Sequence, residues 1–287
     1  MHSENLSPKD KYLLRSVMFN NIEGVVRAIE LGADINMVPD DGLTCIHLVA
    51  EKGFIELTKL LVSLPGIQLD VLSSFGWSPL SNAVYSNHLE ICTILLQSGA
   101  NPNFRVVFEQ TPLHIAVFYK RPIIVAELIK YGADVNSVDC FHQSPLHLAV
   151  FSQPSATITK ILMDSGADPN FKSKSRLSIL TEAVLVAWTP YHTKIISFLI
   201  NFGADVMATD DIKRETPLHK AALNGYVPAL KLLIQHGADI NAKNAYNQLP
   251  VDLARLHGNH DATEELVLID DFFTYQELKE LMDKVYS

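Results

Sequence analysis

The chain has 287 residues, 48% of them hydrophobic, and a formal net charge of -9. This composition can bury a large core, and the length alone suggests two globular domains. No apolar run approaches the roughly 18 residues of a membrane span, and residues 1–10 lack a basic and apolar leader, so we expect no membrane partner. Residues 249–287 hold nine acids against three bases, so we expect no nucleic-acid partner.

The three cysteines, Cys45, Cys92 and Cys140, offer neither a pairing framework nor the paired spacing of a metal site. This pattern suits a reducing compartment. We therefore expect the protein in the cytoplasm, with the nucleus as an alternative.

The first expected elements are two helices near the N-terminus. Ser7-Pro8 followed by Asp10 has the composition of a capped helix start, and a second helix is expected from Ile22 to Leu31, before Gly32. They lack the motif that recurs later, as expected of a terminal repeat with one face in solvent.

From Thr44 onwards a four-residue motif recurs at a nearly constant interval. Thr-Pro-Leu-His stands at Thr111 and Thr216, and near copies begin at Thr44, Ser78, Ser144, Ser178 and Leu249, in steps of 34, 33, 33, 34, 38 and 33 residues. A Gly-Ala-Asp signature follows the same period, for example at Gly132 and Gly237. Two motifs in phase over about 200 residues indicate a repeat array.

The residue pattern of each repeat predicts a helix, a turn, a second helix and a projecting finger. A hydroxyl residue before Pro caps the start of the first helix, and the Leu and Ala of the motif, such as Leu113 and Ala116, fall on one core-facing face. Apolar residues at helical spacing, such as Ile124, Val125 and Leu128, then predict the second helix. Left-handed glycines are expected in the turns, at Gly53, Gly225 and Gly258.

These motifs resemble the ankyrin repeat family, whose unit of about 33 residues carries Thr-Pro-Leu-His-x-Ala. The resemblance covers residues 4–270 and implies an all-α solenoid of helix-turn-helix units joined by β-hairpin fingers. The expected units span residues 4–36, 37–70, 71–103, 104–136, 137–170, 171–207, 208–241 and 242–270. A short C-terminal capping helix is expected over residues 271–287, opened by a capping box at residues 274–277.

No catalytic motif accompanies the repeats: the sequence has no Gly-rich phosphate loop, no Gly-x-Ser-x-Gly and no His-Glu-x-x-His. The resemblance implies that the motif histidines hydrogen-bond within their own turn and to the adjoining finger; they are His47, His114, His147 and His219. His257, His260 and Asp261 are interpreted as a polar turn rather than a metal site. We therefore expect no enzyme activity, no cofactor and no metal.

Aromatic residues recur at two positions of the repeat, three residues before the motif at the fingertip and seven after it at the end of the first helix. The family resemblance implies that these positions line the concave side, where partners dock. The candidate partner-binding residues are Phe75, Trp77, Tyr85, Phe108, Phe118, Tyr119, Phe141, Phe151 and Trp188. An exposed aromatic patch indicates an interaction site; the alternative is that these rings pack within their own hairpins or against neighbouring repeats.

Three departures from the repeat pattern predict local differences. The 38-residue step places an insertion near residues 187–193, where Trp188 and Tyr191 are expected to bulge from one edge, and the fifth unit has one extra residue near residues 153–156. The motif at Ser178 lacks both Pro and His, so the sixth unit is expected to be the least stable. Lys172, Lys174 and Arg176 in one finger, and Lys213 and Arg214 in the next, are interpreted as solubilising, with phosphate binding as the alternative.

The sequence therefore predicts a monomeric, non-catalytic module that binds a protein partner and acts as a scaffold or adaptor. The alternative is a substrate-recognition adaptor of a ubiquitin ligase complex, for which a C-terminal recruitment box would be needed; residues 271–287 show no Leu-Pro-rich box of this kind. Finger asparagines such as Asn136 and Asn241 are interpreted as structural, with substrates of an asparagine hydroxylase as the alternative.

Overall fold

The structure is a computed structural model that describes residues 6–174 and 176–286, without the side chains of residues 273–275 and 277–286. The described chain consists of helices and turns, and its one β-type pairing is the isolated bridge between Lys172 and Ser178. The expected all-α repeat fold is thus confirmed. Chain contacts divide the protein into two compact units, Met1–Leu148 and Ala149–Ser287.

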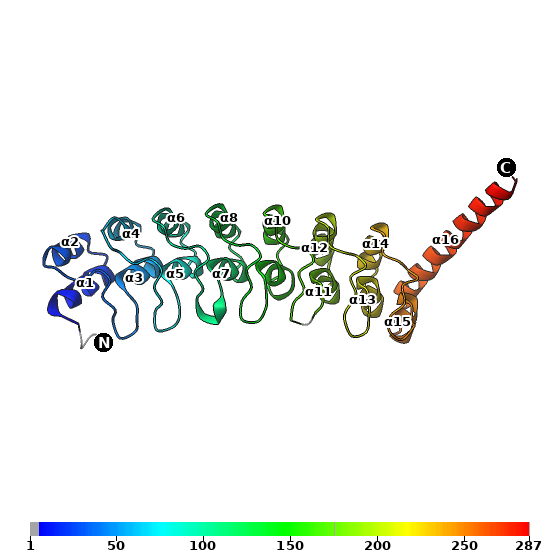
Figure 1. The fold of residues 1–287 in the computed structure, drawn as a ribbon, viewed down its shortest axis with the longest axis horizontal. Coiled ribbons are helices and arrows are strands. Elements are labelled where there is room, and N and C mark those ends of the chain that lie inside the picture. The colour runs from blue at the N-terminus through cyan, green and yellow to red at the C-terminus, as the bar shows by residue number, and fades with distance from the viewer. Residues whose placement is uncertain (1–5, 175, 287) are drawn as a thin grey trace. The chain divides into compact units, whose positions relative to one another are not determined.

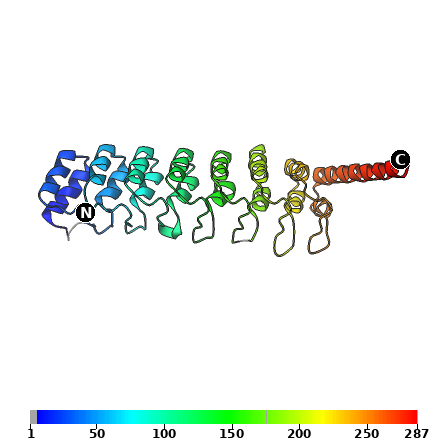
Figure 2. The same ribbon diagram turned by 45° about the horizontal axis from the view of Figure 1, so that its top comes forward.

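In the first unit, helices pair into hairpins that stack in file, with the first helices in one layer and the second helices in another (Figure 1). The helices are α1 (Pro8–Met18), α2 (Ile22–Glu30), α3 (Cys45–Lys52), α4 (Ile55–Val62), α5 (Pro79–Tyr85), α6 (Leu89–Gln97), α7 (Pro112–Phe118), α8 (Pro122–Lys130) and α9 (Pro145–His147), with the short 3-10 turn η1 (Val107–Glu109). The fingers project beyond the layer of first helices (Figure 2).

The second unit repeats this plan. Its helices are α10 (Ala156–Asp164), α11 (Ile179–Leu185), α12 (Pro190–Asn201), α13 (Pro217–Asn224), α14 (Val227–Gln235), α15 (Pro250–Leu256) and α16 (His260–Tyr286), and the π-helical turn η2 (Leu148–Ser152) lies at the junction of the units. First helices pack on first helices, α11 on α13 and α13 on α15, while α10, α12, α14 and α16 form the second layer.

The local signals that predict each hairpin act as expected. The Ser7 hydroxyl accepts the Asp10 amide at the start of α1, and Thr216 caps α13 in the same way. The motif Leu113 and Ala116 are completely buried between helices. The turn glycines expected to be left-handed have φ of 80°, 71° and 69° at Gly53, Gly225 and Gly258.

The motif histidines connect each repeat to the next finger. His114 Nδ1 accepts the Thr111 amide at 3.2 Å, and its Nε2 contacts the Gln143 carbonyl oxygen at 3.0 Å. His47 reaches the Trp77 carbonyl oxygen at 3.0 Å in the same manner, and His219 reaches that of Gln248 at 3.1 Å. The expected structural role is confirmed for these three rings, and His147 is likewise buried.

Finger asparagines form a second link between repeats. The Asn103 side chain donates to the Gly132 carbonyl oxygen at 2.9 Å and accepts the Asp134 amide at 2.7 Å. Asn36 and Asn170 make the same pair of bonds to their following repeats. These three asparagines therefore have a structural role of the kind that the sequence analysis assigns to Asn136 and Asn241, whose backbone amides donate to Asp134 and Asp239.

The fingers differ from the expected β-hairpins because each is too short for a ladder. A few backbone bonds close them, such as Asp139 to Gln143 at 3.1 Å and Asn244 to Gln248 at 3.0 Å, and the described residues contain no strand. A side-chain acceptor replaces the missing ladder bonds: Asp139 Oδ1 accepts the amides of both Phe141 and Gln143.

Two insertions are absorbed within helices. The extra residue of the fifth unit was expected near residues 153–156, and the structure has a π-helical turn directly before it, η2 at Leu148–Ser152. The sixth-unit insertion starts α12 earlier, so that this helix has 12 residues against nine in α14. Trp188 is 68% exposed, but the Tyr191 hydroxyl accepts the Ala156 amide at 2.5 Å and ties the insertion to the preceding hairpin.

The C-terminal segment is helical, but it does not begin a new helix. α16 runs from His260 to Tyr286 without a break, since no Gly or Pro interrupts that stretch. Residues 271–286 therefore continue the second helix of the last repeat. The expected capping box covers residues 274–277. Its side chains, apart from that of Gln276, lie outside the described residues.

Candidate protein-binding groove

Six of the aromatic residues singled out in the sequence lie together between the fingers and the first helices of the first unit, and we call this surface the aromatic groove. Its members are Phe75, Trp77, Tyr85, Phe108, Phe118 and Tyr119. Five of them are 38–68% exposed, and Trp77 is half-buried. Some of these rings contact a ring of the neighbouring repeat, as the alternative interpretation expects, yet five of the six keep a large part of their surface in solvent.

The groove consists of two adjoining hollows of about 570 and 490 Å³. Phe75, Trp77 and Tyr119 line both hollows, so the two are parts of one depression. The first hollow also contains Glu51, the one acidic side chain among its lining residues. The lining of the second contains no charged side chain.

The rings hold one another in place through edge-to-face contacts. Trp77 lies 5.5 Å from Tyr85, Tyr85 lies 4.9 Å from Tyr119, and Tyr119 lies 5.2 Å from Phe118, measured between ring centroids, with interplanar angles of 70–89°. Such geometry is the preferred one for aromatic pairs. Tyr85 stands at the end of the first helix of its repeat, and it contacts Tyr119 at the end of the first helix of the next repeat. The row of rings along these helix ends therefore runs through Tyr119.

Trp77 is positioned by the histidine link. Its carbonyl oxygen accepts from His47 Nε2 at 3.0 Å and from the Ser73 amide at 2.9 Å. Its own amide donates to Ser73 Oγ at 3.3 Å. The indole is therefore carried on a backbone segment fixed from both sides.

Phe108 stands on an unusual turn. Phe108 and Glu109 are consecutive left-handed residues, with φ of 59° and 56°. In the neighbouring finger the Asp139 side chain accepts two backbone amides. The equivalent residue here is Val106, whose side chain has no acceptor. The finger closes as a 3-10 turn instead. Bulky residues rarely adopt this backbone, and such conformations cluster at binding sites.

The remaining candidate residues lie outside the groove. Phe141 continues the row of fingertip aromatics formed by Phe75 and Phe108, and its ring centroid lies 5.8 Å from that of Phe108. Phe151 is 42% exposed and Trp188 68% exposed, and both belong to the second unit.

Several residues that line the hollows are not among the candidates predicted from the sequence. Asn82 and Ile115 line one hollow each and occupy the position directly after the fourth residue of the motif. Leu43 and Glu51 occupy the positions of Trp77 and Tyr85 in the preceding repeat. Asn82 and Ile115 stand in a column that is not aromatic, whereas Glu51 is a non-aromatic member of the helix-end column, so an alignment that considers every column and all its members would have indicated them.

Among the described residues, no three His, Cys, Asp or Glu side chains gather as metal ligands. Cys45 and Cys92 are buried, and desolvation raises the pKa of each thiol to about 12, which disfavours the reactive thiolate. Within the described part of the chain, no helix is both long and apolar enough to span a bilayer.

Comparison with known proteins gives a consistent result. A family model described as ankyrin repeats in three copies matches residues 13–106, 99–173 and 180–273. The crystal structure of the ankyrin repeat domain of Bcl-3, a member of the IkappaB family, matches with a TM-score of 0.70 and 26% identity over 78% of this chain and 98% of that domain.

Curated relatives match shorter shares of their own length. A putative ankyrin repeat protein of Borreliella burgdorferi is 33% identical over 36% of this chain and 46% of that protein. A putative palmitoyltransferase of Danio rerio, ZDHHC13, is 25% identical over 88% of this chain and 33% of that protein. The human cyclin-dependent kinase 4 inhibitor B is 30% identical over 35% of this chain and 69% of its own length. The chain thus spans less than half the length of the first two relatives.

Proposed function

Because this chain belongs to the ankyrin repeat family, we propose that it is a non-catalytic protein–protein interaction module that acts as a scaffold or adaptor. Its partner binds in the aromatic groove of the first unit. The observation that carries this proposal is the exposure of five large aromatic side chains around two adjoining hollows. Contiguous exposed aromatic surface marks interaction sites, because burying it on binding is strongly favourable.

The ring contacts make the groove suited to binding. Because Tyr85, Tyr119 and Phe118 already restrict one another, little side-chain entropy is lost when a partner covers them. The chemistry of the lining favours a partner segment with apolar side chains in both hollows. A basic side chain beside the first hollow would pair with Glu51.

The proposal can be tested with a groove variant and a matched control. Phe75→Ala with Tyr119→Ala removes two rings shared by both hollows, whereas Phe19→Ala with Phe202→Ala removes two exposed rings elsewhere. We expect the wild type and the control to capture the same proteins from a cell lysate, and we expect the groove variant to lose them. Each lost anchor should weaken affinity by up to about thirtyfold. Equal capture by the two variants would refute the groove as the binding site.

A fluorescence titration then locates the contact. The chain has two tryptophans, so Trp188→Phe leaves Trp77 as the single reporter, inside the groove. A captured partner that binds there should shift the Trp77 emission with a saturable dependence on concentration. Saturable binding by another method without any change in emission would place the partner elsewhere.

A further inference from the structure

The fingertips of the second unit are strongly basic although the chain as a whole has a net charge of -9. Three successive fingers carry exposed bases, and we call this surface the basic fingertips. Its charged members are Lys172, Lys174, Arg176, Lys213, Arg214 and Lys243. Among the described residues, Asp211 is the one acid that pairs with them, at 3.5 Å from Lys172 and 3.6 Å from Arg176.

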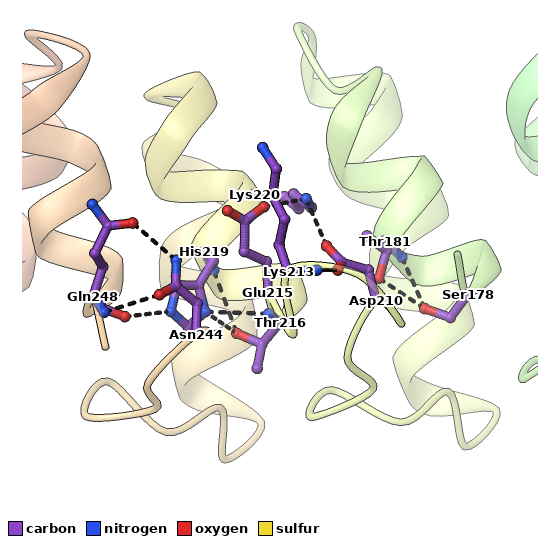
Figure 3. A network of polar contacts seen from close by, with 10 residues as sticks. All are labelled: Ser178, Thr181, Asp210, Lys213, Glu215, Thr216, His219, Lys220, Asn244 and Gln248. Carbon is purple, nitrogen blue, oxygen red and sulfur yellow. Dashed lines mark hydrogen bonds and ion pairs between the residues drawn. The ribbon is translucent and has the colours of Figure 1, made fainter. Parts of the chain in front are cut away.

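A buried ion triad keeps two acids away from this surface (Figure 3). The finger at the start of the seventh unit, residues 208–215, is called the seventh finger, and its sequence has three acids. Two of them, Asp210 and Glu215, turn inward and pair with Lys220, the first at 2.9 Å. The three side chains are 8%, 3% and 12% exposed, respectively. The acids therefore contribute little to the surface, while Lys213 and Arg214 remain in solvent.

The three fingers form one continuous edge. Asp211 of the seventh finger bridges to two bases of the sixth, and the Ala245 amide of the eighth finger donates to the Lys213 carbonyl oxygen at 2.7 Å. The bases are thus held in a fixed order along neighbouring fingers. Clustered charges of one sign attract a partner of the opposite sign and orient its approach.

Two apolar side chains stand among the bases. Ile212 is 84% exposed and Tyr246 is 65% exposed, both at fingertips. An isolated solubilising surface has no need of an almost completely exposed Ile. A ligand that fits both features has acidic groups for the bases and an apolar side chain for Ile212 and Tyr246.

We propose that the basic fingertips bind an acidic protein segment that carries an apolar side chain. A single aromatic ring offers little stacking for nucleic-acid bases, and the acids of residues 249–287 in the same unit would repel a long polyanion. A short acidic segment avoids this repulsion. This surface is separate from the aromatic groove and does not depend on it.

The test uses a fluorescein-labelled 12-residue peptide of Glu and Ser with one central Leu, measured by anisotropy at low salt. Lys174→Glu with Lys213→Glu reverses two fingertip charges, and Lys52→Glu with Lys120→Glu makes the same change of net charge, from -9 to -13, on exposed lysines of the first unit. The wild type and the control should bind alike, and the fingertip variant about tenfold or more weakly. Affinity should fall as salt is raised.

Two further measurements separate the components of the proposal. Ile212→Ser should weaken binding of the Leu peptide but leave binding of a peptide with Ser in place of Leu unchanged. A 20-nucleotide single-stranded DNA should compete poorly. No binding by the wild type, equal losses in the two charge variants, or preferred binding of the DNA would each overturn the proposal, whatever the outcome for the aromatic groove.

Discussion

The histidine links predict a specific loss of stability in mild acid. The amides of Thr111 and Thr216 can only donate, so Nδ1 of His114 and of His219 must accept, and the proton lies on Nε2, which faces a carbonyl oxygen. A second proton on Nδ1 would face a donor. Burial lowers the pKa of both rings, and of His47, although hydrogen bonds to backbone carbonyls oppose the shift.

The sign of the effect follows from the lowered pKa. Below a pH of about 6.5 the unfolded chain takes up protons at these rings, while the folded chain does not until its lower pKa is reached. Stability that is present above this pH is therefore lost as the pH falls. Because the folded rings also begin to take up protons as the pH nears their lowered pKa, each ring contributes a loss of at most about 1.2 kcal/mol between pH 7 and 5.5, and three rings at most about 4 kcal/mol.

Urea denaturation followed by circular dichroism at pH 7 and 5.5 measures this loss. His219→Gln removes one titrating ring, so the pH-dependent part of the free energy of unfolding should shrink by about a third. Imidazole NMR spectra should show the Nε2–H form of all three rings at neutral pH. Rings that gain a proton near pH 6.5 in the folded protein, or a pH dependence unchanged in the variant, would refute the reasoning.

Two further predictions concern links between repeats, and a third concerns the buried ion triad. Met207 stands where other repeats have the finger Asn, and only its sulfur meets the Asp239 amide, at 3.3 Å, so Met207→Asn should stabilise the protein by about 1 kcal/mol in urea denaturation. Gly225→Ala places a Cβ 2.7 Å from the Asn259 side chain at a φ of 71°, and should lower the unfolding free energy by more than about 1 kcal/mol. Lys220→Met leaves two buried carboxylates unpaired, and should cost about 3–5 kcal/mol and lower the melting temperature.

Each of these changes has a matched control. Asn103→Met should destabilise where Met207→Asn stabilises, because it removes both bonds to the next repeat. Gly132→Ala has the same left-handed backbone but no atom within 4 Å of the added Cβ, so it should cost less than Gly225→Ala. Lys59→Met breaks two exposed pairs, with Glu56 and Glu90, and should change stability by less than about 1 kcal/mol. A reversed order within any pair would contradict the corresponding prediction.

The helices, their caps and the core-facing residues could be predicted from the sequence because their causes are local. Thr216 caps the helix that it precedes, and Leu218 and Ala221 share a face through helical spacing alone. Gly53 was predictable because the turn after the first helix needs a positive φ, which Gly adopts at the lowest cost. The periodic alignment also identified the aromatic columns, since equivalent positions of stacked repeats lie side by side.

Tertiary contacts decided what the alignment could not. Tyr85 contacts Tyr119 rather than its equivalent in the next repeat, because ring packing depends on rotamers and neighbours and not on the repeat position. The seventh finger has three acids in sequence, yet it exposes bases, because Lys220 reaches across from α13 and holds two carboxylates in the interior. Sequence by itself thus determined the repeat and its core. Surface charge and groove shape depended on contacts between side chains of different elements, because burial in those contacts determines which charges face solvent.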